Sequence, residues 1–214
     1  MLWPGSHPVA VETVTEIGTD GSFGRVLSTP EHAGTHLDAP AHFVAGGRTV
    51  DAIAAGELVL EAAVIDARDA CARDPDHALD AAELEAFEAE HGRLPAGGAL
   101  LLCTGWDRNG DDPARLLGGD DAASLHFPGF GPSAAALAVE RGVAAIGVDT
   151  VSVDAGVATS YPVHRTTLPA DVWHLEGLVN LDRLPPRGAT VVIGVLPLAG
   201  GSGAPARVLA LLGA

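Results

Sequence analysis

The chain has 214 residues, the length of one domain, and carries 28 acidic and 12 basic residues for a formal net charge of -16. All the basic residues are arginine, so chemistry that needs a lysine amine, such as a Schiff base or a P-loop, is excluded. The chain contains no run of basic residues, and its acidic balance argues against nucleic acid and anionic membrane surfaces as partners.

Strands outnumber helices among the elements that the chain predicts. Alternating apolar residues, short buried runs and turn residues predict strands at 9–15, 23–28, 58–66, 99–104, 144–149, 191–198 and 207–212. Helices are predicted between these strands, and no internal repeat or linker divides the chain. We therefore expect an α/β fold that occupies residues 1–214 as one domain.

Two helices have recognisable ends. The first, at residues 80–91, begins with the capping-box pattern of Asp80 and Glu83. The second, at residues 133–141, places Ser133 at the position of an N-cap. Gly92 and Gly142 follow these helices and predict their C-terminal ends.

The number of cysteines and the length of the apolar runs indicate where in the cell the protein is expected. The two cysteines, Cys71 and Cys103, are too few for a disulfide framework. No basic segment followed by an apolar stretch marks a secretory signal, and the longest apolar runs are too short to span a bilayer. We therefore expect a cytoplasmic protein without membrane contact, in which both thiols are buried and inert.

Three histidines and one aspartate cluster near the N-terminal end, at His32, His36, Asp38 and His42. All four numbers are even, and even positions of an extended chain point to one face. The residues between them are small or apolar, as on the core side of a strand. Imidazoles and a carboxylate on a common face are typical ligands of Zn²⁺ or Mn²⁺.

This segment must bend if its ends are to meet at one ion. Six extended residues span roughly 20 Å, which is more than two ligands of one ion allow. Gly34 lies between His32 and His36 and permits a sharp bend. The sequence therefore predicts a metal site at a bend in the chain.

Further ligands must come from the C-terminal half. His164 and Glu176 are the leading candidates. His174 competes with Glu176, because residues two apart share one face of a strand. The residue types alone leave the choice between these two open.

Residues 32–42, His-Ala-Gly-Thr-His-Leu-Asp-Ala-Pro-Ala-His, resemble the HxGTHxDxPxH signature of the metal-dependent cyclase/hydrolase family. That family includes bacterial kynurenine formamidases and isatin hydrolases. Other stretches resemble family motifs in the same order, at residues 3–5 (WPG), 104–106 (TGW), 147–154 (GVDTVSVD), 164, 176–181 (EGLVNL) and 203–207 (GAPAR). The resemblance covers nearly the whole chain.

The resemblance implies a role for each matching residue. The metal ligands would be His32, His36, Asp38, His164 and Glu176. Five ligands suit two ions of Zn²⁺ or Mn²⁺ per subunit, with His42 left as the acid/base residue. The resemblance favours Glu176 over His174, and it implies a compact β-rich fold of the swivelling β/α/β type with a mixed sheet, usually assembled as a homodimer or higher homo-oligomer.

The implied activity is hydrolysis of a small amide, formamide or cyclic amide. A metal-bound hydroxide attacks the carbonyl, and His42 takes the water's proton and returns it to the leaving amine. The expected substrate contacts are Trp3, Phe43 and Trp106, the last of which begins a long polar loop predicted at 106–131. Trp173 is a further candidate.

Two other functions remain open at this point. Cys103 and Gly177 stand where many family members have arginine and asparagine, which leaves room for a metal-dependent cyclase or lactone hydrolase in a polyketide-like or aromatic pathway. The third possibility is a metal-stabilised protein that binds a ligand without catalysis. His42 would be spare in such a protein, which counts against this possibility.

Overall fold

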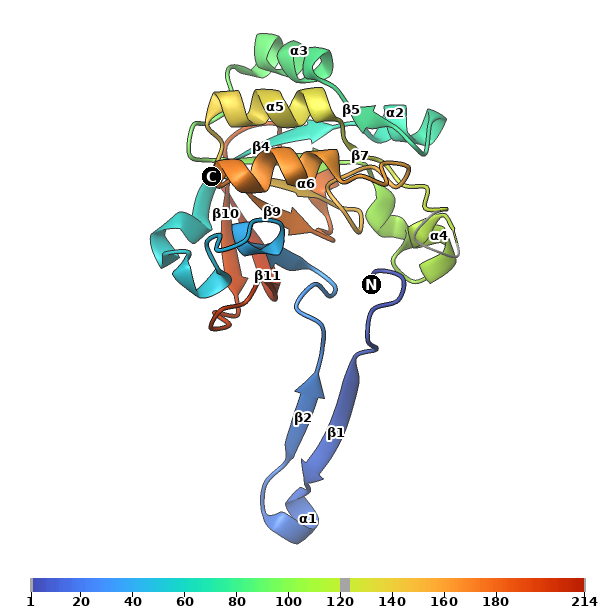
Figure 1. The fold of residues 1–214 in the computed structure, drawn as a ribbon, viewed down its shortest axis with the longest axis vertical. Helices are drawn as coiled ribbons and strands as arrows, with labels where there is room; N and C mark the ends of the chain where they lie inside the picture. The colour runs from blue at the N-terminus through green and yellow to red at the C-terminus, as the bar shows by residue number, and fades with distance from the viewer. Residues whose placement is uncertain (1, 120–123, 214) are drawn as a thin grey trace.

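Seven strands close into a barrel in the computed structural model, which describes residues 2–119 and 124–213 (Figure 1). In order around the barrel they are β10 (Ala189–Val195), β11 (Gly203–Leu212), β3 (His36–Asp38), β9 (Trp173–Glu176), β8 (Ala145–Val148), β6 (Ala99–Cys103) and β4 (Val59–Asp66). The pairs β4–β6, β6–β8 and β8–β9 are parallel, and the remaining pairs are antiparallel. The predicted α/β fold with a mixed sheet is therefore confirmed.

Helices cover one side of the barrel, where α5 packs against both α3 and α6 (Figure 1). The α-helices are α1 (Ile17–Asp20), α2 (Arg68–Arg73), α3 (Ala81–His91), α4 (Pro113–Leu117), α5 (Pro132–Arg141) and α6 (Pro162–Thr167). The 3-10 turns are η1 (Pro40–His42), η2 (Val50–Ala52), η3 (Ala55–Leu58), η4 (Trp106–Asn109), η5 (Leu168–Ala170) and η6 (Leu181–Arg183). Within the described ranges, no helix is long and apolar enough to cross a membrane.

Two apolar layers explain why the central strands read as continuous hydrophobic runs. In β6, Leu101 points into the barrel, whose filling receives side chains from all seven strands. Its neighbours Leu100 and Leu102 point the other way, into the layer shared with α3 and α5. A strand buried on both faces gains from apolar residues at every position, and its burial stabilises the fold on both sides.

Of the two predicted helix N-caps, the one at α3 is confirmed and the one at α5 is wrong. The capping box of α3 is present, because Asp80 accepts from the Glu83 amide at 2.9 Å and Glu83 accepts from the Asp80 amide at 3.1 Å. The prediction of Ser133 as N-cap is wrong. Gly131 occupies that position, and the Ser133 hydroxyl instead accepts from the amide of Ala81 at 3.1 Å, which ties α5 to the start of α3.

The predicted long loop at 106–131 contains short regular elements. It holds η4, α4 and the two-residue strand β7 (Gly129–Phe130), which pairs with β5 (Ala78–Leu79). Part of the predicted loop, residues 120–123, lies outside the described residues. The described remainder contributes Leu116 and Phe127 to a small apolar cluster with Val151, which follows β8.

A hairpin near the N-terminus projects away from the barrel, with α1 at its tip (Figure 1). It consists of β1 (Ala10–Thr15) and β2 (Gly24–Ser28), the two strands predicted there, and these pair only with each other among the described strands. Its large apolar side chains are exposed, and they are Val9, Val11, Val14, Ile17, Phe23, Val26 and Leu27. An exposed apolar surface of this kind is typical of an interaction site.

Candidate metal centre and active site

Four polar residues lie side by side on β3 and β9. The antiparallel register places His36 opposite Glu176 and Asp38 opposite His174. Leu37 alternates with the two β3 residues and points into the barrel, so the polar side chains face the helix side. All four are buried. The pairing of two short strands thus gathers four possible ligands in one place.

The chain bends on both sides of β3, as the predicted metal site requires. Gly34 has a φ of +64°, in the left-handed region that favours glycine, and the rings of His32 and His36 lie 5.3 Å apart. After β3, the turn η1 folds the chain back, and His42 stacks on His32 with ring centroids 4.0 Å apart. His42 therefore arrives through a turn, whereas the even-position pattern described an extended chain.

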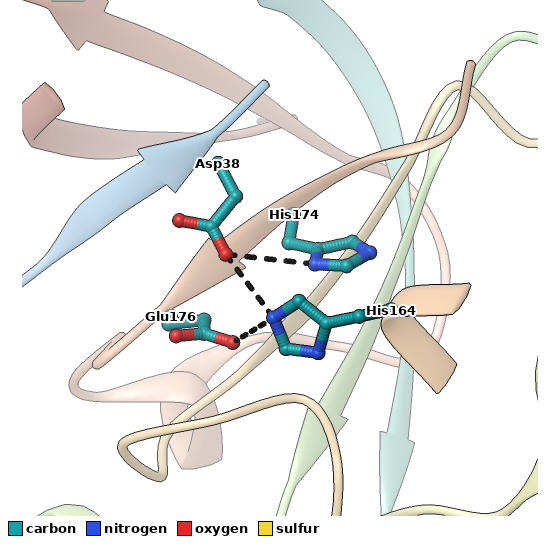
Figure 2. A group of neighbouring side chains, drawn as sticks. All are labelled: Asp38, His164, His174 and Glu176. Atoms are coloured by element: carbon teal, nitrogen blue, oxygen red, sulfur yellow. Dashed lines mark ion pairs between the residues drawn. The ribbon is translucent and has the colours of Figure 1, made fainter. Parts of the chain in front are cut away.

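His164 reaches the same place from α6. Its Nε2 lies 3.4 Å from Asp38 Oδ2 and 3.5 Å from Glu176 Oε1 (Figure 2). On the other side of the ring, Nδ1 donates to Asp154 at 2.6 Å, which fixes the orientation of the imidazole. The structure thus brings all five predicted ligands together. It adds His174, which lies beside Asp38, His164 and Glu176 (Figure 2).

The two N-terminal histidines are held in the same manner as His164. His36 Nδ1 donates to the carbonyl of Gly34 at 3.0 Å. His32 Nε2 lies 3.0 Å from the hydroxyl of Ser202, which itself donates to Glu31 at 2.6 Å. In each ring, one nitrogen is occupied by the protein and the other faces the carboxylates. This arrangement is typical of metal-ligating histidines, whose second nitrogen is held by a hydrogen bond.

Positive charge is strongly favoured at the carboxylates. Burial opposes ionisation of Asp38, but His36 and the neighbouring histidines hold the pKa of this carboxyl well below its usual value. Burial likewise opposes protonation of His36, yet Asp38 and Glu176 raise its pKa well above the usual value. Divalent cations compete with such imidazole protons. Asp38 Oδ2 is buried and has no hydrogen-bond partner among the described residues, so the group fits a bound metal.

His42 has a different environment from His36 and His164. Burial lowers its pKa to about 4, against the opposing influence of Asp38. Its ring lies beside that of His32 and 5.9 Å from that of His164. An imidazole with this pKa is neutral near pH 7 and can accept a proton.

A cavity of about 360 Å³ opens onto these residues, which is a volume typical of small-molecule sites. One side of it is lined by His32, His36, His42, His164 and Glu176. Another part of the lining is aromatic, because the rings of Trp3 and Phe43 lie 6.1 Å and 5.7 Å from that of Tyr161. The cavity therefore suits a flat, apolar ligand with one polar group.

Two tryptophans and the long loop do not join this cavity. Among its described lining residues, Trp3 and Phe43 are present as predicted, while Trp106 is not. The Trp106 indole donates to the carbonyl of Leu116 at 2.8 Å and packs in the cluster behind Trp3. Trp173 is buried inside the barrel. None of the described residues of the segment 106–131 lines the cavity.

Sequence reasoning missed the residues that support the site. Tyr161 adopts a φ of +53° just before Pro162 and contributes a ring to the cavity wall. Asp154 and Ser202 hold two of the histidines. Asp154 lies in the stretch that resembles the GxDTxSxD motif, so its signal was present, whereas nothing in the sequence pointed to Ser202.

The two cysteines do not offer a nucleophile. Both are buried and unpaired. Burial raises the pKa of Cys71 and of Cys103 to about 12, so each stays a thiol near pH 7. Neither lines the cavity among the described residues, as the expectation of inert thiols requires.

The buried His, Asp and Glu group beneath an aromatic cavity defines a metal-centred enzyme site on a mixed α/β barrel. The chain belongs to the Cyclase family, whose model, described as "Putative cyclase", matches residues 2–155.

Named relatives agree with this assignment. The chain is 34% identical to an isatin hydrolase from Roseibium aggregatum, over 95% of this chain and 81% of the relative. It is 28% identical to a kynurenine formamidase from Salinibacter ruber, over 97% of this chain and 90% of the relative. Isatin hydrolase A from Ralstonia solanacearum matches in structure with a TM-score of 0.90 and 37% identity, over 96% and 82% of the two chains. The protein is therefore an enzyme, as predicted, and the non-catalytic alternative is set aside.

Proposed function

We propose that this enzyme hydrolyses the carbon–nitrogen bond of a small cyclic amide or aryl formamide. The observation that carries the proposal is the opening of the ligand group and His42 into an aromatic-walled cavity. The names of the relatives, isatin hydrolase and kynurenine formamidase, support the same class of substrate. Both names refer to substrates in which a flat aromatic ring carries the amide nitrogen, and such a ring matches the cavity wall.

Different residues of the chain bind the substrate and transfer the proton. Trp3, Phe43 and Tyr161 hold the aromatic ring of the substrate and exclude water from around it. His42, neutral in this environment, takes the proton of the attacking water and passes it to the nitrogen that leaves the carbonyl carbon. A bound divalent metal would polarise the carbonyl and lower the pKa of the attacking water.

We also propose that the site holds two ions, of Zn²⁺ or Mn²⁺. The two oxygens of Asp38 face different histidines, since Oδ1 lies 3.2 Å from His36 and Oδ2 lies 3.4 Å from His164. Glu176 does the same, with Oε2 at 3.3 Å from His36 and Oε1 at 3.5 Å from His164. Two carboxylates that each present both oxygens in this way support a pair of ions that share them.

A substrate panel tests the proposed reaction. The full chain, loaded with Zn²⁺ or with Mn²⁺, is assayed on isatin, N-formylkynurenine and an aryl lactone. We expect turnover of at least one of the two amides and a lower kcat/KM for the lactone. Turnover of the lactone with neither amide attacked would favour the alternative, a lactone hydrolase or cyclase, and would overturn the proposed reaction.

We propose that the enzyme assembles as a homodimer through the β1–β2 hairpin. Val11 and Leu27 face each other across this hairpin and are both exposed. Changing both to aspartate is expected to yield monomers by sedimentation, because two charges are costly to bury in an interface. Ala10→Asp, on the other face of the same hairpin, is the control and is expected to leave the mass unchanged. A double variant with the mass of the parent would contradict this proposal.

A cytoplasmic location and a single functional unit over residues 1–214 complete the proposal. The unpaired state of both cysteines supports a reducing compartment. The barrel itself joins β3 to β11 near the end of the chain, which supports one unit.

A further inference from the structure

His174 is a buried histidine with an unexplained polar atom. It lies opposite Asp38 on β9, and its side chain is fully buried. Its Nδ1 points at Asp38 Oδ2 from 3.6 Å (Figure 2), and neither atom has a hydrogen-bond partner among the described residues. Leaving a buried polar atom unpaired is unfavourable, so two unpaired atoms that face each other require an explanation.

Hydrogen bonds on the far side of the ring determine which nitrogen of His174 carries the proton. The Thr167 hydroxyl donates its only proton to the carbonyl of Val163 at 2.8 Å. His174 Nε2 lies 2.6 Å from this same hydroxyl oxygen, which is left to accept. Nε2 therefore carries the proton of the neutral ring, and Nδ1 presents a lone pair to a carboxylate oxygen. Two lone pairs that face each other repel unless a cation lies between them.

The surrounding atoms have the spacing of a ligand set. Nδ1 of His174 lies within 4.8 Å of ligand atoms of Asp38, His164 and Glu176. The closest separations within this group are 3.4, 3.5 and 3.6 Å (Figure 2). Tetrahedral bonds of the usual length place neighbouring ligand atoms roughly 3.3–3.6 Å apart.

We propose that His174 is a fourth protein ligand of the metal position formed by Asp38, His164 and Glu176, and that Thr167 positions it. The proposal rests on the metal dependence proposed above. Four protein ligands close this position in the manner of a structural zinc site. His174 and Asp38 do not line the cavity among its described residues, whereas His164 and Glu176 do, beside His32, His36 and His42.

Two neighbouring threonines of α6 provide a matched test. Thr166 and Thr167 each donate to the carbonyl four residues earlier, at 2.8 Å, but only Thr167 contacts His174. We would measure Zn²⁺ stoichiometry and affinity of the metal-stripped full chain by chelator competition, for the parent and for Thr166→Val, Thr167→Val and His174→Leu. The melting temperature of each metal-free variant reports on structure alone.

We expect the parent to bind two Zn²⁺ ions. Thr167→Val should weaken one of them by about 10–100-fold, as for other partners that orient a metal-bound histidine, and His174→Leu by at least as much. Thr166→Val should bind Zn²⁺ as the parent does.

One outcome would overturn this inference alone. Thr167→Val and His174→Leu would then bind Zn²⁺ within twofold of the parental affinity, and only their metal-free melting temperatures would be lower, so His174 would be a core residue. A parent chain that binds no Zn²⁺ would overturn the proposed metal dependence as well. If His174→Leu does not fold, Thr167→Val decides the matter, together with ¹⁵N shifts of the metal-free ring. A proton on Nδ1 there would also overturn the inference.

Discussion

His42→Gln is expected to lower kcat by about 10²–10⁴-fold, the usual contribution of a general acid/base, while the metal content stays that of the parent. Glutamine can fill much of the same space but cannot take a proton from water and return it to a leaving nitrogen. The pKa of His42, lowered to about 4 by burial, leaves the parent imidazole neutral and able to perform this transfer. The loss should appear in kcat more than in KM, because proton transfer occurs in the transition state.

A histidine outside the site provides the control for this loss. His91 ends α3 and contacts Glu90 at the surface, so His91→Gln should retain parental rates. Metal content, measured on the same preparations by elemental analysis, separates lost chemistry from lost ligation. A His42→Gln variant that keeps more than a tenth of the parental kcat would remove His42 from the mechanism. A variant that loses metal would instead reassign His42 as a ligand.

Asp38→Asn is expected to abolish both metal binding and turnover. Asp38 presents its two oxygens to different histidines, so its substitution weakens both proposed positions at once. The affinity for Zn²⁺ should fall by more than about 100-fold, beyond the range found for residues that only orient a ligand. Dialysis against a chelator should likewise remove the activity of the parent, and Zn²⁺ or Mn²⁺ should restore it to the parent but not to the variant.

A second histidine–aspartate pair serves as the matched control. Asp76 contacts His126 at 2.9 Å away from the cavity, so Asp76→Asn removes the same kind of contact without touching the site. Parental metal content and rate are expected for it. Activity of the parent that survives complete chelation would contradict the metal mechanism, whatever the behaviour of Asp38→Asn.

The sequence indicated the local part of the site well. Gly34 and the alternation of His36 with Asp38 follow from backbone rules that act over a few residues, and both are present in the structure. The choice between His174 and Glu176 could not be made from alternation, because both point the same way and both join the group. Which strand lies beside β3 depends on closure of the barrel, a contact between distant segments that no short-range pattern encodes.

Two departures from the family pattern also need the structure to be understood. Gly177 has a φ of +63°, in the left-handed region that glycine and asparagine both tolerate, so its exchange for asparagine preserves the turn. Cys103 ends β6 and is buried in the barrel filling. Neither lines the cavity among the described residues. Ser202 is a supporting residue that no sequence pattern indicated, because it contacts His32 from 170 positions along the chain.

The strand β3 is only three residues long, yet it lies between β9 and β11, which the chain supplies last. A nascent polypeptide has therefore synthesised the first histidines of the centre long before it can enclose an ion between them. Metal uptake by a chain that lacks β9 and β11 should be weak, because β3 then has no partner strand and Glu176 is missing. The bound cation would then act as a lock that joins two distant segments of the chain, and its binding free energy would stabilise the fold against reopening.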